Sequence, residues 1–451
     1  MAENTAAEIL TVTPGRPLVG ELGSPALPGD KSLSHRAALL AAMADGESQI
    51  ENFQVSGVTR PMLEALRGAG VPWNLEGTRL QVQGIGLRPA QPMQPLQVHC
   101  GNSATTLRLL AGALAAWGLP AVLDGTPGLR RRPMGRIVEP LQQMGVPIQA
   151  QPGGGAPLVL QAAAARPHGL HYRLPVASAQ VKSCLLLAAL AADDETLLEE
   201  DGPSRDHTER MLAAMGAGVE SWSEAGWYRT RLRPPADGCL KPLAMTLPGD
   251  ISAAAFLLVA ALITPGSRLL LRQVGLNPTR TGLLDALQAM GADLRITNRR
   301  ESGGEPLGDL EAVYSLLHGV QVSGELVVRM IDEFPAFAVA AAFASGMTEV
   351  RDAVELRHKE SDRISALGEE LCKLGVGFAE TPDGFTIQGG RPLHGARVNP
   401  HGDHRLAMSL AVAGLAAGGP VVVDSANIID ESFPEFARVL QQLGGQAQRT
   451  V

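Results

Sequence analysis

The apolar positions of this chain follow a pattern that repeats six times. Each copy ends a stretch of helical periodicity with a leucine, three further residues and a glycine, and an apolar strand-like run usually follows. The copies are Leu66–Gly70, Leu141–Gly145, Leu212–Gly216, Leu287–Gly291, Leu371–Gly375 and Leu440–Gly444. Their glycines are 75, 71, 75, 84 and 69 residues apart. A glycine in this place is typical of a left-handed helix C-cap, and the nearly even spacing predicts a repeat protein.

Several repeats also begin alike, with a glycine and small polar residues before an alanine- and leucine-rich stretch. The starts are Gly29–Ser32, Gly101–Ser103, Gly249–Ser252 and Gly402–Arg405. Residues 255–261 are apolar on every side, which predicts a buried helix. Each repeat is therefore expected to form a helix, a strand, a second helix and further strands. This is an α/β unit whose apolar first helix points inward. Because 451 residues exceed one hydrophobic core, we expect two domains of three repeats.

Composition narrows the class of protein. The net charge of −8 argues against nucleic acid as the main partner. No apolar run reaches the length of a membrane span, and the first residues lack the features of a signal peptide. The cysteines are far apart without a CxxC pair, which favours reduced thiols in the cytoplasm over disulfides or zinc. They are Cys100, Cys184, Cys239 and Cys372.

The densest polar interruption of the apolar pattern is Pro28–Arg36. A glycine-led turn opens a helix there, so free backbone N–H groups and the positive end of the dipole would face an anion. Lys31, Ser32 and Arg36 can converge on one phosphate. The spacing does not fit a nucleotide P-loop, since Asp30 stands before the lysine. A capped surface helix with solvated charges is the alternative.

Similar polar segments recur near the starts of other predicted helices. They are Gly101–Arg108, Arg130–Pro133, Ser178–Ser183, Ser204–Glu209, Arg357–Arg363 and Asp403–Arg405. An isolated run of this kind is usually a solvated face, and we expect two of the three adjacent arginines 130–132 to be solvated. Cations at so many repeat starts predict instead a shared cleft for a substrate with several negative charges.

Two carboxylates stand out against these cations. Asp332 precedes an apolar helix, where an N-cap is the simplest role, and Glu360 lies between Lys359 and Arg363. In a polyanion cleft either group can be a general acid or base. His401 and His404 lack further ligands at a familiar spacing, so we expect no metal site.

These segments, in this order, resemble the 5-enolpyruvylshikimate-3-phosphate synthase family. The resemblance rests on Pro28–Arg36, Gly101–Arg108, Arg132–Met134, Ser178–Ser183, Lys359–Arg363 and Gly402–Met408, and spans about Leu18 to Gly444. It implies an α/β fold, the enolpyruvyltransferase inside-out barrel, with two domains of three βαβαββ repeats around buried parallel helices. It also implies a discontinuous first domain (1–28 plus 248–451), a second domain (29–247) and an active site in the cleft between them.

The resemblance implies transfer of the enolpyruvyl group of phosphoenolpyruvate to the 5-hydroxyl of shikimate 3-phosphate, with release of phosphate. Asp332 is expected to be the base and Glu360 the acid, with Lys31 as the competing acid. The residues implied for shikimate 3-phosphate are Lys31, Ser32, Arg36, Ser178, Ala179, Gln180, Arg205, Asp332 and Lys359. Those implied for phosphoenolpyruvate are Lys31, Ala104 through its backbone, Arg132, Gln180, Arg363 and Arg405. We expect no cofactor, a monomer and a cytoplasmic location.

Three positions depart from the family pattern. Gly57 replaces a frequent Asp, Glu431 stands where many members have Lys, and Ala104 stands where many have Gly. The added methyl of Ala104, together with Ser178–Ser183, resembles the glyphosate-tolerant bacterial group. The alternatives are the sister enzyme that acts on UDP-N-acetylglucosamine and a non-catalytic phospholigand-binding protein on the same scaffold. The sister family differs at Ser32, usually Asn there, and has a reactive Cys in the loop occupied here by Gly128–Pro133. A related RNA 3′-phosphate cyclase is disfavoured by the acidic charge.

Overall fold

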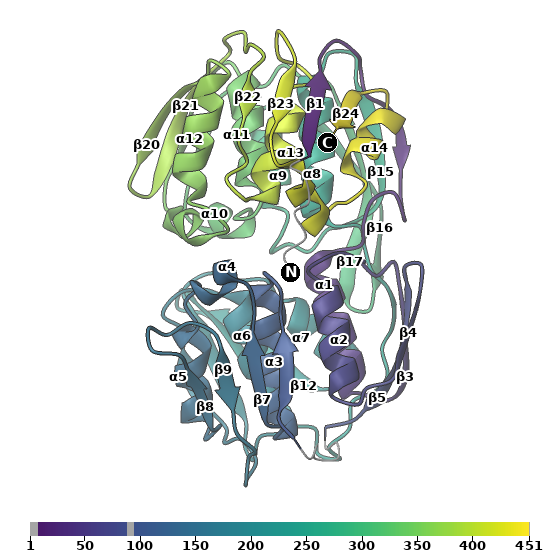
Figure 1. Ribbon diagram of the computed structural model, residues 1–451, viewed down its shortest axis with the longest axis vertical. Coiled ribbons are helices and arrows are strands. Elements are labelled where there is room, and N and C mark those ends of the chain that lie inside the picture. Colours follow the sequence, from purple (N-terminus) through teal and green to yellow (C-terminus); the bar gives the residue numbers. More distant parts are fainter. Residues whose placement is uncertain (1–7, 88–93, 451) are drawn as a thin grey trace. The chain divides into compact units, whose positions relative to one another are not determined.

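A computed structural model describes residues 8–87 and 94–450, which divide into two compact units (Figure 1). Unit 1 comprises Met1–Pro28, Gly249–Arg300 and Pro306–Val451. Unit 2 comprises Gly29–Pro248 and Glu301–Glu305. Each unit has its own hydrophobic core. No helix in the described part of the chain is both long and apolar enough to cross a membrane.

The described residues form six four-stranded sheets, three in each unit. In unit 2 the sheet orders are β14-β3-β5-β4, β6-β7-β9-β8 and β10-β11-β13-β12. The strands are β3 (Asp45–Glu51), β4 (Trp73–Glu76), β5 (Arg79–Ile85), β6 (Leu96–His99), β7 (Ala121–Asp124), β8 (Ile148–Ala150), β9 (Leu158–Leu160), β10 (His171–Arg173), β11 (Thr196–Glu200), β12 (Gly218–Glu224), β13 (Trp227–Arg233) and β14 (Ala244–Thr246).

In unit 1 the sheet orders are β22-β23-β1-β24, β16-β17-β15-β2 and β18-β19-β21-β20. The strands are β1 (Ile9–Thr13), β2 (Val19–Leu22), β15 (Arg268–Gly275), β16 (Asp293–Ser302), β17 (Glu305–Val313), β18 (Gln321–Val322), β19 (Gly346–Val350), β20 (Gly377–Thr381), β21 (Gly384–Gly389), β22 (Arg397–Val398), β23 (Val421–Val423) and β24 (Gln446–Thr450). In every sheet one edge strand pairs in parallel with its neighbour.

Two helices accompany each sheet, an inner and an outer one. The inner helices are α1 (Lys31–Met43), α3 (Ala104–Trp117), α6 (Ala179–Ala189), α8 (Ile251–Ile263), α11 (Phe334–Phe343) and α13 (His404–Ala413). The outer helices are α2 (Arg60–Gly68), α5 (Gly135–Gln143), α7 (His207–Ala214), α9 (Gly282–Ala289), α12 (Arg363–Lys373) and α14 (Phe436–Gln442). Short α4 (Pro127–Arg130), α10 (Glu325–Arg329) and 3₁₀ turns at Val354–His358 and Ala426–Glu431 complete the helices.

The inner helices form the centre of each unit, as the apolar pattern predicts. All thirteen residues of α8 are buried. In unit 2, α3 packs against α6 and α1, and in unit 1, α8, α11 and α13 pack against one another. Helices buried on every side need no polar face. The predicted α/β class with six repeats around buried helices is confirmed.

The repeated glycine ends each outer helix through one hydrogen-bonding pattern. All six glycines have positive φ, from +80° at Gly145 to +101° at Gly444. The residue after each glycine donates its N–H to the carbonyl of the signature leucine, for example Val71 to Leu66 at 3.0 Å and Ala217 to Leu212 at 2.9 Å. This is the Schellman arrangement, which satisfies a helix carbonyl that has no partner within the helix.

Three of the sheets contain strands from distant parts of the sequence, which the pattern of repeats did not predict. β14 pairs in parallel with β3, and β2 pairs in parallel with β15, so each crossing between the units supplies the first strand of another repeat. β1 lies between β23 and β24 and completes the sixth sheet. The first described strand of the chain therefore belongs to the same sheet as its last two strands.

The thiols provide a direct test of this core packing. Burial raises the pKa of both Cys100 and Cys184 to about 12, whereas Cys239 and Cys372 are exposed. Because the thiolate is the reactive form, we expect Ellman's reagent to titrate two thiols in the native protein and four after denaturation. The double variant C239S/C372S should show no fast reaction, and rapid labelling of that variant would contradict the burial of Cys100 and Cys184.

Candidate active site

Four helices of unit 2 begin within one hydrogen-bonded cluster. α1, α3, α6 and α7 start at Lys31, Ala104, Ala179 and His207. Ser103 lies 3.4 Å from the ring of His35, which ties α3 to α1. The N–H groups of a helix's first turn have no partner within the helix, and the dipole is positive there. The cluster thus gathers four sites at which anions are stabilised.

At the start of α1, the side chains of Lys31 and Ser32 are half-buried. Asp30 caps the helix by accepting a hydrogen bond from the Leu33 N–H at 2.9 Å. The Arg205 guanidinium approaches to 3.5 Å from the Ser32 hydroxyl. The structure thus brings Arg205 to the start of α1, although 173 positions separate it from Ser32 in the sequence.

Arg36 lies deeper than these residues and bonds to protein groups. It is buried, and it donates to the Thr208 and Ser183 hydroxyls at 2.9 Å each and to the Ser32 carbonyl at 3.0 Å. Burial and the nearby charge of Arg205 lower the pKa of Arg36 to about 10, so it still carries its charge at neutral pH. Arg36 is a fixed internal cation that joins α1, α6 and α7.

Gln180 is held in place from α3. Its amide donates to the Thr105 hydroxyl at 2.8 Å and accepts from Arg108 at 2.5 Å. Arg108 also donates to the Pro133 carbonyl at 3.0 Å, so the same guanidinium fixes the loop that carries Arg132. The sequence placed Arg108 in a candidate segment but assigned it no role.

The arginines of that loop differ in their environment. Arg130 is exposed and forms an ion pair with Asp124, and Arg131 is exposed as well. Arg132 is half-buried. Arg132 is thus the arginine of the three that the fold withdraws from solvent, in line with its selection as a ligand.

The centre of the candidate residues in unit 1 is Arg363, which is fully buried at the start of α12. It donates to Asp403 at 2.7 Å and to Glu360 at 2.8 Å, and its remaining nitrogen lies 3.5 Å from Asp332. Burial lowers the pKa of Arg363, but the carboxylates of Asp403, Glu360 and Asp332 outweigh this effect, so the pKa is raised overall. One guanidinium thereby orders both candidate catalytic carboxylates.

Asp332 also contacts Arg405, the second residue of α13. Arg405 donates to the Asp332 carbonyl at 3.2 Å and lies 3.8 Å from its carboxylate. Asp332 stands two residues before α11, whose N-cap residue is Glu333, so the capping role that was the simplest interpretation is wrong. The carboxylate is instead held between two arginines.

Lys359 and Glu431 complete the surroundings in unit 1. Lys359 is half-buried and directly precedes Glu360. Glu431 lies 3.5 Å from the ring of His404, which is buried beside Arg405. The residue at the usual lysine position therefore places an anion, rather than a cation, next to a histidine.

The two histidines considered as metal ligands contact different carboxylates. His401 lies 2.7 Å from Glu370. Among the described residues, Glu369, Glu370 and His401 are close enough together to hold an ion. Lys373 already lies 2.8 Å from Glu370, and it balances the charge of that group. His404 belongs to the Arg405 cluster instead.

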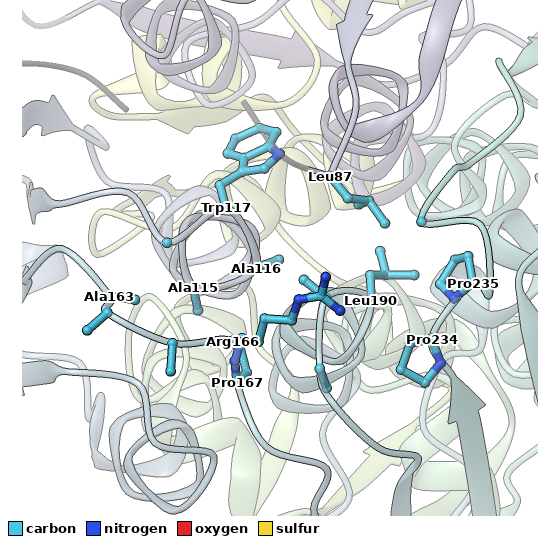
Figure 2. A pocket seen from close by; sticks show the side chains of 16 residues that line it. Leu87, Ala115, Ala116, Trp117, Ala163, Arg166, Pro167, Leu190, Pro234 and Pro235 are labelled. Carbon is cyan, nitrogen blue, oxygen red and sulfur yellow. The ribbon is translucent and has the colours of Figure 1, made fainter. Parts of the chain in front are cut away.

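A pocket of about 380 Å³ in unit 2 lies away from these residues (Figure 2). It is lined by Leu87, Trp117, Leu190, Pro234 and their neighbours around Arg166. Trp117 ends α3 and Leu190 caps α6, so the pocket lies at the opposite ends of these helices from Ala104 and Ala179, about 16–20 Å away. Helix C-termini are negative and disfavour anions. The pocket is therefore not the site for the phosphorylated substrates.

Comparison with known proteins identifies the family. The family model for EPSP synthase (3-phosphoshikimate 1-carboxyvinyltransferase) matches residues 12–440. The 3-phosphoshikimate 1-carboxyvinyltransferase of Synechococcus sp. (strain JA-3-3Ab) is 48% identical over 444 residues, 97% of each chain. That of Desulforudis audaxviator is 47% identical over 436 residues, 96% of this chain and 99% of the relative. A solved EPSP synthase from Acinetobacter baumannii has a TM-score of 0.87 at 37% identity, and the match covers 98% of this chain and 100% of that one. The chain belongs to the EPSP synthase family.

Proposed function

We propose that the chain catalyses the reaction of its family, the transfer of the enolpyruvyl group of phosphoenolpyruvate to the 5-hydroxyl of shikimate 3-phosphate. The observation that carries the proposal is the pair of clusters described above. Unit 2 offers cations and helix N-termini that suit a phosphate, and unit 1 offers two carboxylates ordered by Arg363. A protein that only binds phosphorylated ligands has no need of these carboxylates.

Shikimate 3-phosphate is bound mainly by unit 2. Lys31, Ser32 and Arg205 contact its phosphate, and Arg36 supplies a fixed charge beneath them. Ser178, Ala179 and Gln180 bind through the N-terminal turn of α6, which is half-buried and so is open to a ligand. Asp332 and Lys359 bind the ring hydroxyls.

Phosphoenolpyruvate carries a carboxylate and a phosphate, both of which match guanidinium groups. Arg363 and Arg405 bind it from unit 1. The Arg363 nitrogen that lies 3.5 Å from Asp332 forms no hydrogen bond to a described residue of the structure. The remaining ligands are Lys31, Arg132, Gln180 and the N–H at Ala104, the first residue of α3.

The reaction is an addition followed by an elimination. Asp332 takes the proton of the 5-hydroxyl, the oxygen bonds to C2 of phosphoenolpyruvate, and Glu360 protonates C3, with Lys31 as the competing acid. This gives a tetrahedral intermediate with a methyl group. The methyl group then loses a proton while the C2–O bond to phosphate breaks, and the C2–C3 double bond returns. Fixed carboxylates stabilise the positive charge that develops at C2.

The sister reaction on UDP-N-acetylglucosamine remains the alternative in the same fold class, and the family match does not favour it. We propose that the enzyme acts as a monomer in the cytoplasm without metal or cofactor. Gel filtration with light scattering tests the monomer directly.

One prediction concerns Asp332, the proposed base. Phosphate release from the purified protein should require both substrates, and Asp332→Asn should lower kcat at least about a hundredfold, as is usual when a general base is lost. Glu360→Gln should lower kcat similarly. Asp424→Asn is a matched control, since Asp424 forms only a surface ion pair with Arg397. Phosphate release at the normal rate in D332N would exclude Asp332 as the base.

Another prediction concerns the inhibitor glyphosate. The Ala104 side chain is buried at the N-terminus of α3, and we propose that its methyl group crowds glyphosate more than the shorter phosphoenolpyruvate. Removing one methyl group from a tight pocket changes binding by roughly tenfold or more. Ala104→Gly should therefore lower the inhibition constant for glyphosate by about that factor. Ala111→Gly, in the middle of the same helix, should leave it unchanged. Equal inhibition constants in A104G and the native enzyme would refute this role.

A further inference from the structure

Lys182 is buried in unit 2 between two carboxylates. Its ammonium lies 2.8 Å from Glu200 and 2.9 Å from Glu209, and the three side chains are 5%, 2% and 6% exposed. Lys182 belongs to α6, Glu200 ends β11 and Glu209 belongs to α7. The trio therefore joins three elements of one repeat at the side from which the candidate ligands project.

Glu200 holds two ligand-bearing segments at once. One carboxylate oxygen accepts from the Ser178 N–H at 3.0 Å, and the other accepts from the Ser204 hydroxyl at 2.8 Å. The Lys182 ammonium donates to the Ser204 carbonyl at 3.3 Å. Ser178 opens the Ser178–Gln180 segment, and Ser204 directly precedes Arg205. The ion pair thus fixes the spacing between Gln180, which precedes Lys182 in the sequence, and Arg205, which follows Glu200.

The trio also reaches Arg36 through α7. Thr208, next to Glu209, accepts from Arg36 at 2.9 Å and lies 2.7 Å from the Ser183 hydroxyl. Ser183 in turn follows Lys182 on α6. A shift of α7 relative to α6 would consequently move Arg36 and Arg205 together.

Stability alone does not explain so many buried charges. Replacing a buried ion pair by apolar residues of similar volume is often neutral or stabilising. Burial lowers the pKa of Lys182, but the two carboxylates outweigh this effect, so the pKa is raised overall. Burial also raises the pKa of Glu209. Such a charged network is well suited to fixing geometry, because each hydrogen bond has a set direction.

Building on the proposed function, we propose that Lys182 and Glu200 are positioning residues for shikimate 3-phosphate. They hold the Ser178–Gln180 turn and Arg205 at the spacing that this substrate requires, and they do not touch the reacting atoms. Their loss therefore weakens binding of shikimate 3-phosphate and leaves the chemistry on the bound substrate intact.

The test is a steady-state comparison of Glu200→Gln, Ser204→Ala and the double variant. Because a displacement of about 1 Å can cost up to about a hundredfold, we expect E200Q to raise the KM for shikimate 3-phosphate by ten- to a hundredfold. The kcat and the KM for phosphoenolpyruvate at saturating shikimate 3-phosphate should stay within about threefold. S204A should raise the same KM less than E200Q does. The double variant should resemble E200Q, because both changes break the same hydrogen bond, from the Ser204 hydroxyl to Glu200.

Two controls separate positioning from folding and from net charge. Lys182→Met should reproduce E200Q, while Lys241→Met, the same change at an exposed lysine of unit 2, should have no effect. Glu209→Gln removes an equal charge from the trio but leaves the bonds to Ser178 and Ser204, so its KM should rise less than that of E200Q. If K182M does not fold, E200Q and S204A decide the question.

Three outcomes would overturn the proposal. The first is an unchanged KM for shikimate 3-phosphate in E200Q, and the second is an equal rise of this KM in E200Q and E209Q. The third is a general defect in E200Q, in which kcat and melting temperature fall and the KM values of both substrates rise. Failure of the proposed function has a separate signature, since the native protein would then release no phosphate. In that case calorimetry of shikimate 3-phosphate binding to the native protein and E200Q still tests the positioning role.

Discussion

Burial of the inner helices is the constraint on which the rest of this structure depends. Helices such as α8 are apolar along their whole length, so polar chemistry is confined to their ends. The unpaired N–H groups and the positive dipole are at the N-terminal ends. Where the fold brings several of these ends together, as it does for α1, α3 and α6, a site for anions follows from the architecture before any particular side chain is considered.

Cations at such ends require internal anions, because an unpaired buried charge is costly. Arg363 meets Asp403 at 2.7 Å, and Lys182 meets Glu200 at 2.8 Å. Asp403 additionally accepts from the Arg405 N–H at 2.8 Å as the N-cap of α13. These acids hold the cations in one orientation. The acidic residues of the site thus organise its basic ones.

Local patterns in the sequence were sufficient to predict the six repeats. The Leu-to-Gly signature is a complete Schellman motif, and its hydrogen bonds are made within six residues. Glu200 and Glu209 carried no such signal, because their partner Lys182 lies on another element and their role depends on packing. Glu305 is likewise buried and lies 2.8 Å from His207, a residue 98 positions away in the sequence. Long-range pairing of this kind is decided by the tertiary fold.

The glycine-led starts of α1 and α8 have similar backbones but different side-chain surroundings. A Cβ atom at Gly29 would lie 1.8 Å from the Asn52 carbonyl oxygen, so this turn requires glycine. A Cβ atom at Gly249 would lie 2.5 Å from a methyl group of Leu27, so the Leu27 side chain would have to shift.

After Gly29 the helix presents Lys31 and Ser32. At the corresponding start of α8, Ile251 takes the place of the lysine, and Ser252 bonds to Glu333 and to Arg280. That helix end is neutralised from within, and Glu333 directly follows Asp332. The two helix starts therefore differ through their side chains: the start of α1 is left for an anion, and the start of α8 supports the segment that carries Asp332, the proposed base.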